Sequence, residues 1–192
     1  MSEIVPPAKE RTLYLSNQVS QSTIHALVRD ILAIERSDAA LATYYQGRGM
    51  AYNPEPITLY VDSYGGECYS CFGLLSVMDM CATPIRTVVT GCAMSCGFLI
   101  AIHGHERIAY PNATLMFHQV SAYTEGKVGD MKVDMAEAVR LQDKIEVMTL
   151  RRTKLTKSQL KKNRELKEDW FMAPAEALKL GVIDRIAKSN IL

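Results

Sequence analysis

Ser95 lies in the segment GCAMSCG, residues 91–97, between two cysteines and two glycines. Three side chains in this segment are potential nucleophiles, those of Cys92, Ser95 and Cys96. A small-residue packing site would have the same composition, because free cysteine usually behaves as a small hydrophobe. The β-branched run IRTVVT before the segment predicts a strand, and the apolar run after it predicts a buried helix. We therefore expect Ser95 in the first turn of a helix, where free backbone N–H groups and the helix dipole favour an oxyanion.

A second glycine-containing turn follows another predicted strand. The strand ITLYVD, residues 57–62, runs into Ser63, Tyr64 and the pair Gly65-Gly66. Because glycine has no Cβ, a backbone N–H at this turn can approach a reacting carbonyl closely. The loops after the strands carry the site in an α/β fold, so this turn and Ser95 are expected to meet. A serine beside such donors suits acyl transfer, and a plain turn is the alternative interpretation.

A nucleophilic serine requires a general base, and the chain has four histidines. His118 ends the predicted strand TLMFHQ, at the edge of the sheet where a base would face Ser95. His25 lies within an amphipathic helical pattern. His103 and His105 form an H-x-H pair that has no third metal ligand at short spacing. His118 is therefore the preferred base.

Several carboxylates remain as the group that would orient the imidazole. Three aspartates of the predicted long helix, Asp130, Asp134 and Asp143, are expected on its exposed face. The local sequence does not choose among the other candidates, which are Asp62, Asp169 and Asp184. The context A-M-S-C-G lacks the first glycine of the G-x-S-x-G elbow, which argues against a lipase-like enzyme.

Strands and helices alternate along the chain and predict a single domain. The predicted strands cover residues 12–15, 57–62, 85–90, 107–110, 114–117 and 182–186, and the predicted helices 20–34, 69–80, 128–150, 158–164 and 174–180, besides the buried helix after residue 91. This alternation implies right-handed βαβ units and a mainly parallel sheet. Residues 1–10 are expected to form a flexible arm, and residues 43–56 a loop rich in Gly, Pro and Tyr.

Composition excludes several classes of function. The net charge of +1 does not favour nucleic acid or an anionic membrane surface. The longest apolar run, around residues 92–102, is too short to span a bilayer. The five cysteines lack paired zinc-type spacing, and the N-terminus lacks the apolar region of a secretory signal. A reducing compartment is expected: the cytoplasm, which is the host's for a viral protein, or the stroma or matrix of an organelle for an organellar protein.

Four ordered blocks carry a resemblance to a known family. ITLYVDSYGG is similar to YLYINSPGG, and TGCAMSCGFLIAIHG to the nucleophile block G-x-A-A-S-M-G-A-x-L-L-x-A-G. RIAYPNATLMFHQ is similar to R-x-A-L-P-N-S-x-I-M-I-H-Q, and EDWFMAPAEALKLGVIDRI to a block that begins R-D-x-F. From about Arg11 to its end, the chain resembles the ClpP family, the proteolytic subunits of Clp proteases, which are self-compartmentalised serine peptidases.

The resemblance implies roles for particular residues. It implies a triad of Ser95, His118 and Asp169, and an oxyanion hole formed by the backbone N–H groups of Gly66 and Cys96. It also implies a crotonase-like α/β core with a protruding handle over residues 121–150, whose helix covers residues 126–150. Peptide would pair as an added strand along Ser121, Ala122, Tyr123 and Thr124. No metal or organic cofactor is required for this chemistry.

The resemblance also implies an assembly and a partner. Family members form heptameric rings that stack as a tetradecamer and enclose the sites in a chamber. An ATP-driven unfoldase of the Clp type delivers polypeptide substrates. The expected function is therefore that of a serine endopeptidase subunit of the ATP-dependent type.

The chain departs from the family pattern at several positions. About ten residues precede Thr12, where family members carry an axial loop, so the N-terminus is expected to be shortened. Tyr64 replaces a proline, and Thr58 replaces an aromatic residue of the unfoldase-docking pocket. Glu67 adjoins the oxyanion glycine and would oppose the oxyanion unless its carboxylate points away. Two alternatives therefore stay open: a catalytically impaired ring subunit that assembles with active paralogues, and an acyl-CoA enzyme of the crotonase fold.

Overall fold

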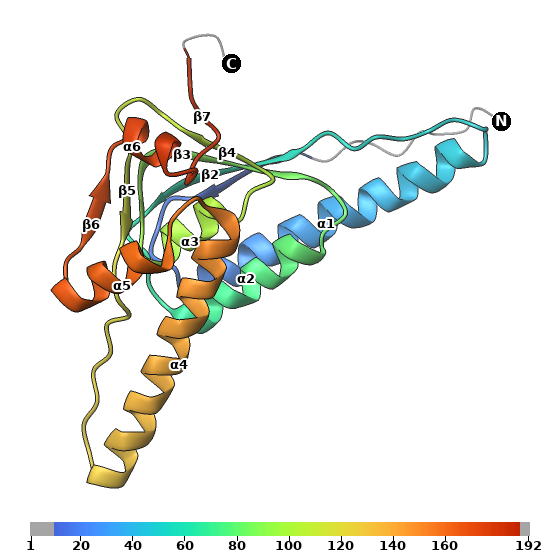
Figure 1. Cartoon of the computed structure of the whole chain (residues 1–192). Helices are drawn as coiled ribbons and strands as arrows, with labels where there is room; N and C mark the ends of the chain where they lie inside the picture. The colour runs from blue at the N-terminus through green and yellow to red at the C-terminus, as the bar shows by residue number, and fades with distance from the viewer. Residues whose placement is uncertain (1–9, 189–192) are drawn as a thin grey trace.

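Residues 10–188, which the computed structural model describes, form a seven-stranded, mostly parallel sheet with helices packed around it (Figure 1). The elements in chain order are β1 (Thr12–Leu15), α1 (Gln21–Gln46), β2 (Ile57–Ser63), α2 (Cys68–Met80), β3 (Ile85–Met94), α3 (Cys96–Ile102), β4 (Glu106–Ala109), β5 (Thr114–Phe117), α4 (Val128–Arg152), α5 (Lys157–Leu166), β6 (Trp170–Met172), α6 (Pro174–Lys179) and β7 (Arg185–Ile186). The predicted α/β class and parallel sheet are confirmed. Residues 1–9 of the expected arm lie outside the described residues.

Strand β3 changes its partner halfway along its length. It pairs in parallel with β4 over residues 86–89 and with β5 over residues 92–94. On its other side, its register with β2 shifts between Val61 and Ser63. Asp62 lies at this irregularity and accepts a hydrogen bond from the Cys92 amide at 2.9 Å. The change of partner brings β5 alongside β3 just before Ser95.

Helix α3 is the most deeply buried helix of the described chain. Every residue from Cys96 to Ile102 is buried, as its uniformly apolar composition predicts. It packs on β3, and α2 and α4 pack against it. Figure 1 shows α1, α2 and α3 on one face of the sheet, and α6 lies beside β5, β6 and β7. The start of α3 is therefore held from several directions.

Helix α1 continues to Gln46, 12 residues beyond its predicted end at Ile34. Ser20 begins it with a capping box that includes Thr23. Residues 35–46 contain good helix formers and no glycine or proline, so nothing ends the helix before Gly47. The predicted loop over residues 43–56 therefore starts four residues later.

A buried carboxylate holds the end of this loop against the body. Asp38 of α1 accepts hydrogen bonds from Arg11, Tyr52 and Thr83. Burial would raise the pKa of Asp38, but these three hydrogen bonds outweigh it, and the net pKa is lowered. The carboxylate is therefore charged at neutral pH and ties α1 to three separate segments.

The segment between β5 and α4 leads away from the sheet, and α4 returns alongside it (Figure 1). Only its C-terminal half is buried, at Leu141, Gln142, Ile145 and Thr149. Apolar side chains of its N-terminal half are exposed: Val128, Met131, Val133, Met135 and Val139. The helix ends two residues beyond the predicted boundary. No helix within residues 10–188 has the length and hydropathy required to span a membrane.

Candidate active site

Ser95 occupies a strained turn between a strand and a helix. β3 ends at Met94, α3 begins at Cys96, and Ser95 lies between them as the N-cap, with φ 53° and ψ −120°. The expected position in the first helical turn is thus wrong by one residue. A non-glycine residue with such dihedrals costs about 1–3 kcal/mol, and such strain is common at functional sites. The turn is held by a hydrogen bond from the Ser95 amide to the Met116 carbonyl at 3.0 Å.

The glycine turn after β2 lies directly against Ser95. Gly65 has φ +100°, and a Cβ at this position would lie 2.7 Å from the Ser95 Cβ. Only glycine tolerates both the dihedral angle and this close approach. The predicted meeting of the two turns is therefore present, and it depends on the missing side chain at position 65.

Two backbone amides beside Ser95, those of Gly66 and Cys96, are the candidate donors of an oxyanion hole. The Val19 amide donates to the Gly65 carbonyl at 2.8 Å, and the Glu67 amide donates to the Val19 carbonyl at 2.9 Å. Because successive amides of a paired extended segment point in opposite directions, the Gly66 N–H points away from Val19. Cys96 is the first residue of α3, so its N–H has no carbonyl within the helix to bind.

Cysteine thiols donate hydrogen bonds to the carbonyl groups of Gly66 and Cys96. The Cys96 thiol donates to the Gly66 carbonyl at 3.3 Å, and the Cys71 thiol donates to the Cys96 carbonyl at 3.6 Å. A hydrogen bond from Cys68 lowers the pKa of Cys96, but Cys71 and burial outweigh it and raise that pKa to about 12. Burial also raises the pKa of Cys92. Since the thiolate is the reactive form, neither cysteine is suited to act as the nucleophile at neutral pH.

His118 and Asp169 are brought together by strands β5 and β6. These strands are antiparallel, with Phe117 opposite Trp170, so the residue after β5 meets the residue before β6. The His118 Nδ1 lies 3.4 Å from the Asp169 Oδ1. This is longer than an ordinary N–H···O hydrogen bond, and it is an electrostatic contact between side chains that are 26% and 54% exposed.

The other two candidate acids have different partners. Asp62 accepts from the Cys92 amide, and Asp184 pairs with Arg107. Of the three carboxylates that the sequence left open, Asp169 is therefore the one at His118. Strand β6 was not predicted from the sequence, and without it the contact cannot be anticipated from local pattern.

A cavity of about 190 Å³ joins these groups. Ser95 and His118 both line it, together with Gly66 and Cys96, and the other lining residues are Tyr64, Cys68, Leu99, Phe117, Val120, Ser121 and Ile145. Most of these additional side chains are apolar, which suits a cavity that holds an apolar side chain of a peptide. Asp169 lines a second cavity of about 510 Å³, beside Trp170 and Phe171.

The Glu67 carboxylate is bound at the start of α2. It accepts a hydrogen bond from the Ser70 hydroxyl at 2.7 Å, within the first turn of α2. Glu67 is not among the residues that line the cavity around Ser95. The repulsion considered from the sequence is therefore reduced by the direction of the side chain.

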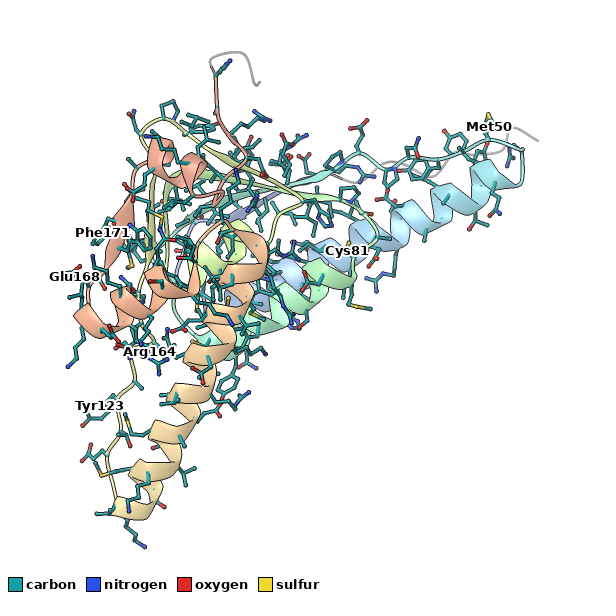
Figure 2. The ribbon with its side chains drawn as sticks, viewed as in Figure 1. Met50, Cys81, Tyr123, Arg164, Glu168 and Phe171 are labelled. Atoms are coloured by element: carbon teal, nitrogen blue, oxygen red, sulfur yellow. The ribbon has the colours of Figure 1, made fainter. Side chains whose placement is uncertain are left out.

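The predicted substrate-strand residues differ in their positions. Ser121 lines the cavity, whereas Ala122, Tyr123 and Thr124 do not. The segment over residues 118–127 contains no strand. Tyr123 is 86% exposed and projects away from the body (Figure 2), and the Thr124 hydroxyl donates to Asp134 at 2.9 Å.

The histidine pair at the end of α3 is engaged in the fold. His103 is buried, with its Nδ1 at 2.8 Å from the Leu99 carbonyl. The Nδ1 of His105 accepts from the Ile85 amide at 3.1 Å. Within the described chain, no group of three or more His, Cys, Asp or Glu side chains is arranged to hold a metal ion.

Gln142 was not identified from the sequence as a residue of the site. It is buried on α4 and accepts from the Val120 amide, beside the cavity. The available signal was a polar residue next to Leu141, within the apolar positions of the predicted long helix.

Comparison with known proteins places the chain in a family. Residues 5–190 match the family model described as Clp protease. Over 181 residues, the chain is 29% identical to a protein of Deinococcus radiodurans named ATP-dependent Clp protease proteolytic subunit. The alignment covers 93% of this chain and 80% of that protein. The chain therefore belongs to the Clp protease family, and its mostly parallel α/β fold is consistent with that of the family's proteolytic subunits.

Proposed function

We propose that this chain is a serine endopeptidase subunit of the ClpP type, with Ser95 as nucleophile, His118 as base and Asp169 as the orienting acid. One observation carries the proposal: a single cavity joins Ser95, His118 and the backbone at Gly66 and Cys96. Family membership supports proteolysis as the activity. The strained turn at Ser95 supports a chemical role for that serine rather than a packing role.

The chemistry follows from these positions. His118 Nε2 takes the Ser95 proton while Nδ1 faces Asp169, and Ser95 Oγ attacks the peptide carbonyl. Proton transfer requires Oγ and Nε2 to come within about 2.6–3.2 Å. The amides of Gly66 and Cys96 stabilise the oxyanion, and each such donor contributes about 10²–10³-fold to the rate. His118 then protonates the leaving amine, and water hydrolyses the acyl-enzyme.

We also propose that copies of this chain assemble through α4. Four exposed apolar side chains of its N-terminal half lie at helical spacing on one face and form a stripe that a second copy would cover: Val128, Met131, Met135 and Val139. In the proposed assembly, heptameric rings stack as a tetradecamer around the sites. An ATP-driven unfoldase supplies unfolded polypeptide, as the description of the Deinococcus relative as an ATP-dependent protease subunit suggests.

Covalent labelling tests this function. A phosphonofluoridate reagent should label Ser95, as peptide mapping would show, and the label should be lost in His118→Ala. A folded and assembled chain that takes no label would refute the proposal and favour the impaired ring subunit. Binding of coenzyme A without labelling would instead favour the acyl-CoA enzyme.

A further inference from the structure

A buried glutamine on α4 holds the chain segment that leaves His118. Gln142 is only 2% exposed, and its Oε1 accepts from the Val120 amide at 2.7 Å. Its Nε2 donates to the Glu146 Oε1 at 2.8 Å. Both ends of the side-chain amide are therefore used, which is the usual condition for a buried polar side chain.

The segment that Gln142 holds contains no regular secondary structure of its own. Residues 118–127 form neither helix nor strand, although Val120 and Ser121 line the cavity at Ser95. A second contact with α4 lies further along, where the Thr124 hydroxyl donates to Asp134. The segment runs beside α4 in Figure 1, so these two hydrogen bonds tether it along the helix.

The bond to Gln142 determines which backbone groups remain for a substrate. Successive N–H groups of an extended chain point to opposite sides. A peptide that pairs with this segment requires it to be extended. The Val120 N–H, which donates to Gln142 on α4, then leaves the Ser121 N–H on the side of the peptide, and Ser121 lines the cavity. A peptide that pairs with this segment can therefore bond to the Ser121 N–H and not to the Val120 N–H.

We propose that Gln142 is a positioning residue that sets the register in which a peptide substrate pairs with the backbone at Ser121. This inference rests on the proposed function. Without the acceptor, the Val120 N–H is free to turn toward the substrate, and a slip of one residue turns every substrate side chain to the opposite face. His118 is held separately, by the pairing of β5 with β6 and by Asp169. Gln142 therefore acts on substrate binding and not on proton transfer.

Steady-state kinetics on a fluorogenic peptide test this role. Gln142→Leu keeps the size of the side chain and removes both hydrogen bonds, and KM should rise about tenfold while kcat changes less than about twofold. The rate at which the phosphonofluoridate labels Ser95 should also stay within about twofold, because this small reagent does not pair with the segment. Thermal unfolding and size measurements establish that the variant is folded and assembled.

A double variant provides the matched control. Gln142→Glu combined with Glu146→Gln exchanges the amide and the carboxylate, so an oxygen at position 142 still accepts from Val120 and an amide at position 146 still donates to it. This variant should restore KM to within about twofold of the unmodified chain. Should the leucine variant fail to fold, Gln142→Met is measured in the same way.

Three results would overturn the inference: an unchanged KM in the leucine variant, a loss of labelling equal to the loss of peptide cleavage, or no recovery in the double variant. Failure of the proposed function gives a different result. The unmodified chain would then neither accept label at Ser95 nor cleave the peptide.

Discussion

The turn that carries Ser95 and the segment that leaves His118 meet at one cavity, but they are held very differently. Ser95 lies between a buried strand and a wholly buried helix, with Gly65 packed against it. The segment over residues 118–127 has no regular structure and is tied to α4 by the hydrogen bonds of Val120 and Thr124. Chemistry requires fixed distances, whereas peptide binding requires a surface that accepts many sequences.

The two regions are held in place by different interactions. Ser95, Gly66 and Cys96, the proposed nucleophile and oxyanion donors, are positioned by the core of the single chain. Helix α4 leaves its apolar stripe exposed, and in the proposed assembly a second copy covers this stripe. Mutations should therefore act on activity within one chain in the first region, and through assembly or substrate binding in the second.

The largest effect is expected at Ser95. Ser95→Ala and Ser95→Gly should each lower peptide hydrolysis at least about 10³-fold, because both remove the nucleophile. The glycine variant should also be more stable than the alanine variant, by about 1 kcal/mol or more, since glycine tolerates φ 53° without strain. Peptide hydrolysis and denaturant unfolding measure the two effects. Equal stability of the two variants would show that the turn stores no strain.

Next in size is a matched pair of glycine substitutions in the two regions. Gly65→Ala places a Cβ 2.7 Å from Ser95, so it should lower kcat about 10²-fold and destabilise the fold by about 1–3 kcal/mol. Gly129→Ala on α4 meets no atom within 4 Å, so it should leave kcat nearly unchanged and should stabilise the fold by up to about 1 kcal/mol. Assays of peptide cleavage and thermal unfolding compare them, and similar losses in both variants would contradict the difference drawn between the regions.

A smaller effect on the single chain is expected at the handle. Met135 is 52% exposed and belongs to the apolar stripe of α4, so Met135→Lys should alter the unfolding free energy of the single chain by less than about 0.5 kcal/mol. It should nevertheless reduce assembly, because it places charge on the apolar stripe. Light scattering coupled to size separation measures the assembly. An unchanged assembled mass would show that this stripe is not an interface between copies.

The smallest effect concerns pH and the buried core. Burial lowers the pKa of His103 below its ordinary value and outweighs its hydrogen bond to the Leu99 carbonyl. The unfolded chain therefore binds a proton more readily, and His103 should reduce stability as pH falls below about 6.5 toward the folded pKa. His103→Gln should flatten this part of the curve of unfolding free energy against pH. A curve that is equally steep in the variant would assign the pH dependence to other groups.

Much of this organisation follows from local pattern. The β-branched and apolar runs predicted β2, β3, β5 and α3, and the glycines beside them placed the site at the ends of the strands. Some boundaries were wrong for local reasons, since α1 continues through a stretch of good helix formers and α3 begins one residue after Ser95. Strand β6 has only three residues and is defined by pairing with β5, so its own sequence carried little signal.

The sequence by itself determined the α/β class, the choice of Ser95 and His118 as candidate nucleophile and base, and the presence of glycine where another backbone must approach. These properties depend on short-range periodicity and on residue type. Only the tertiary structure decided that Asp169 lies at His118, that Glu67 turns to Ser70, and that Gln142 binds Val120. Each of these contacts depends on a side-chain direction or on a pairing between segments, which residue order alone does not specify.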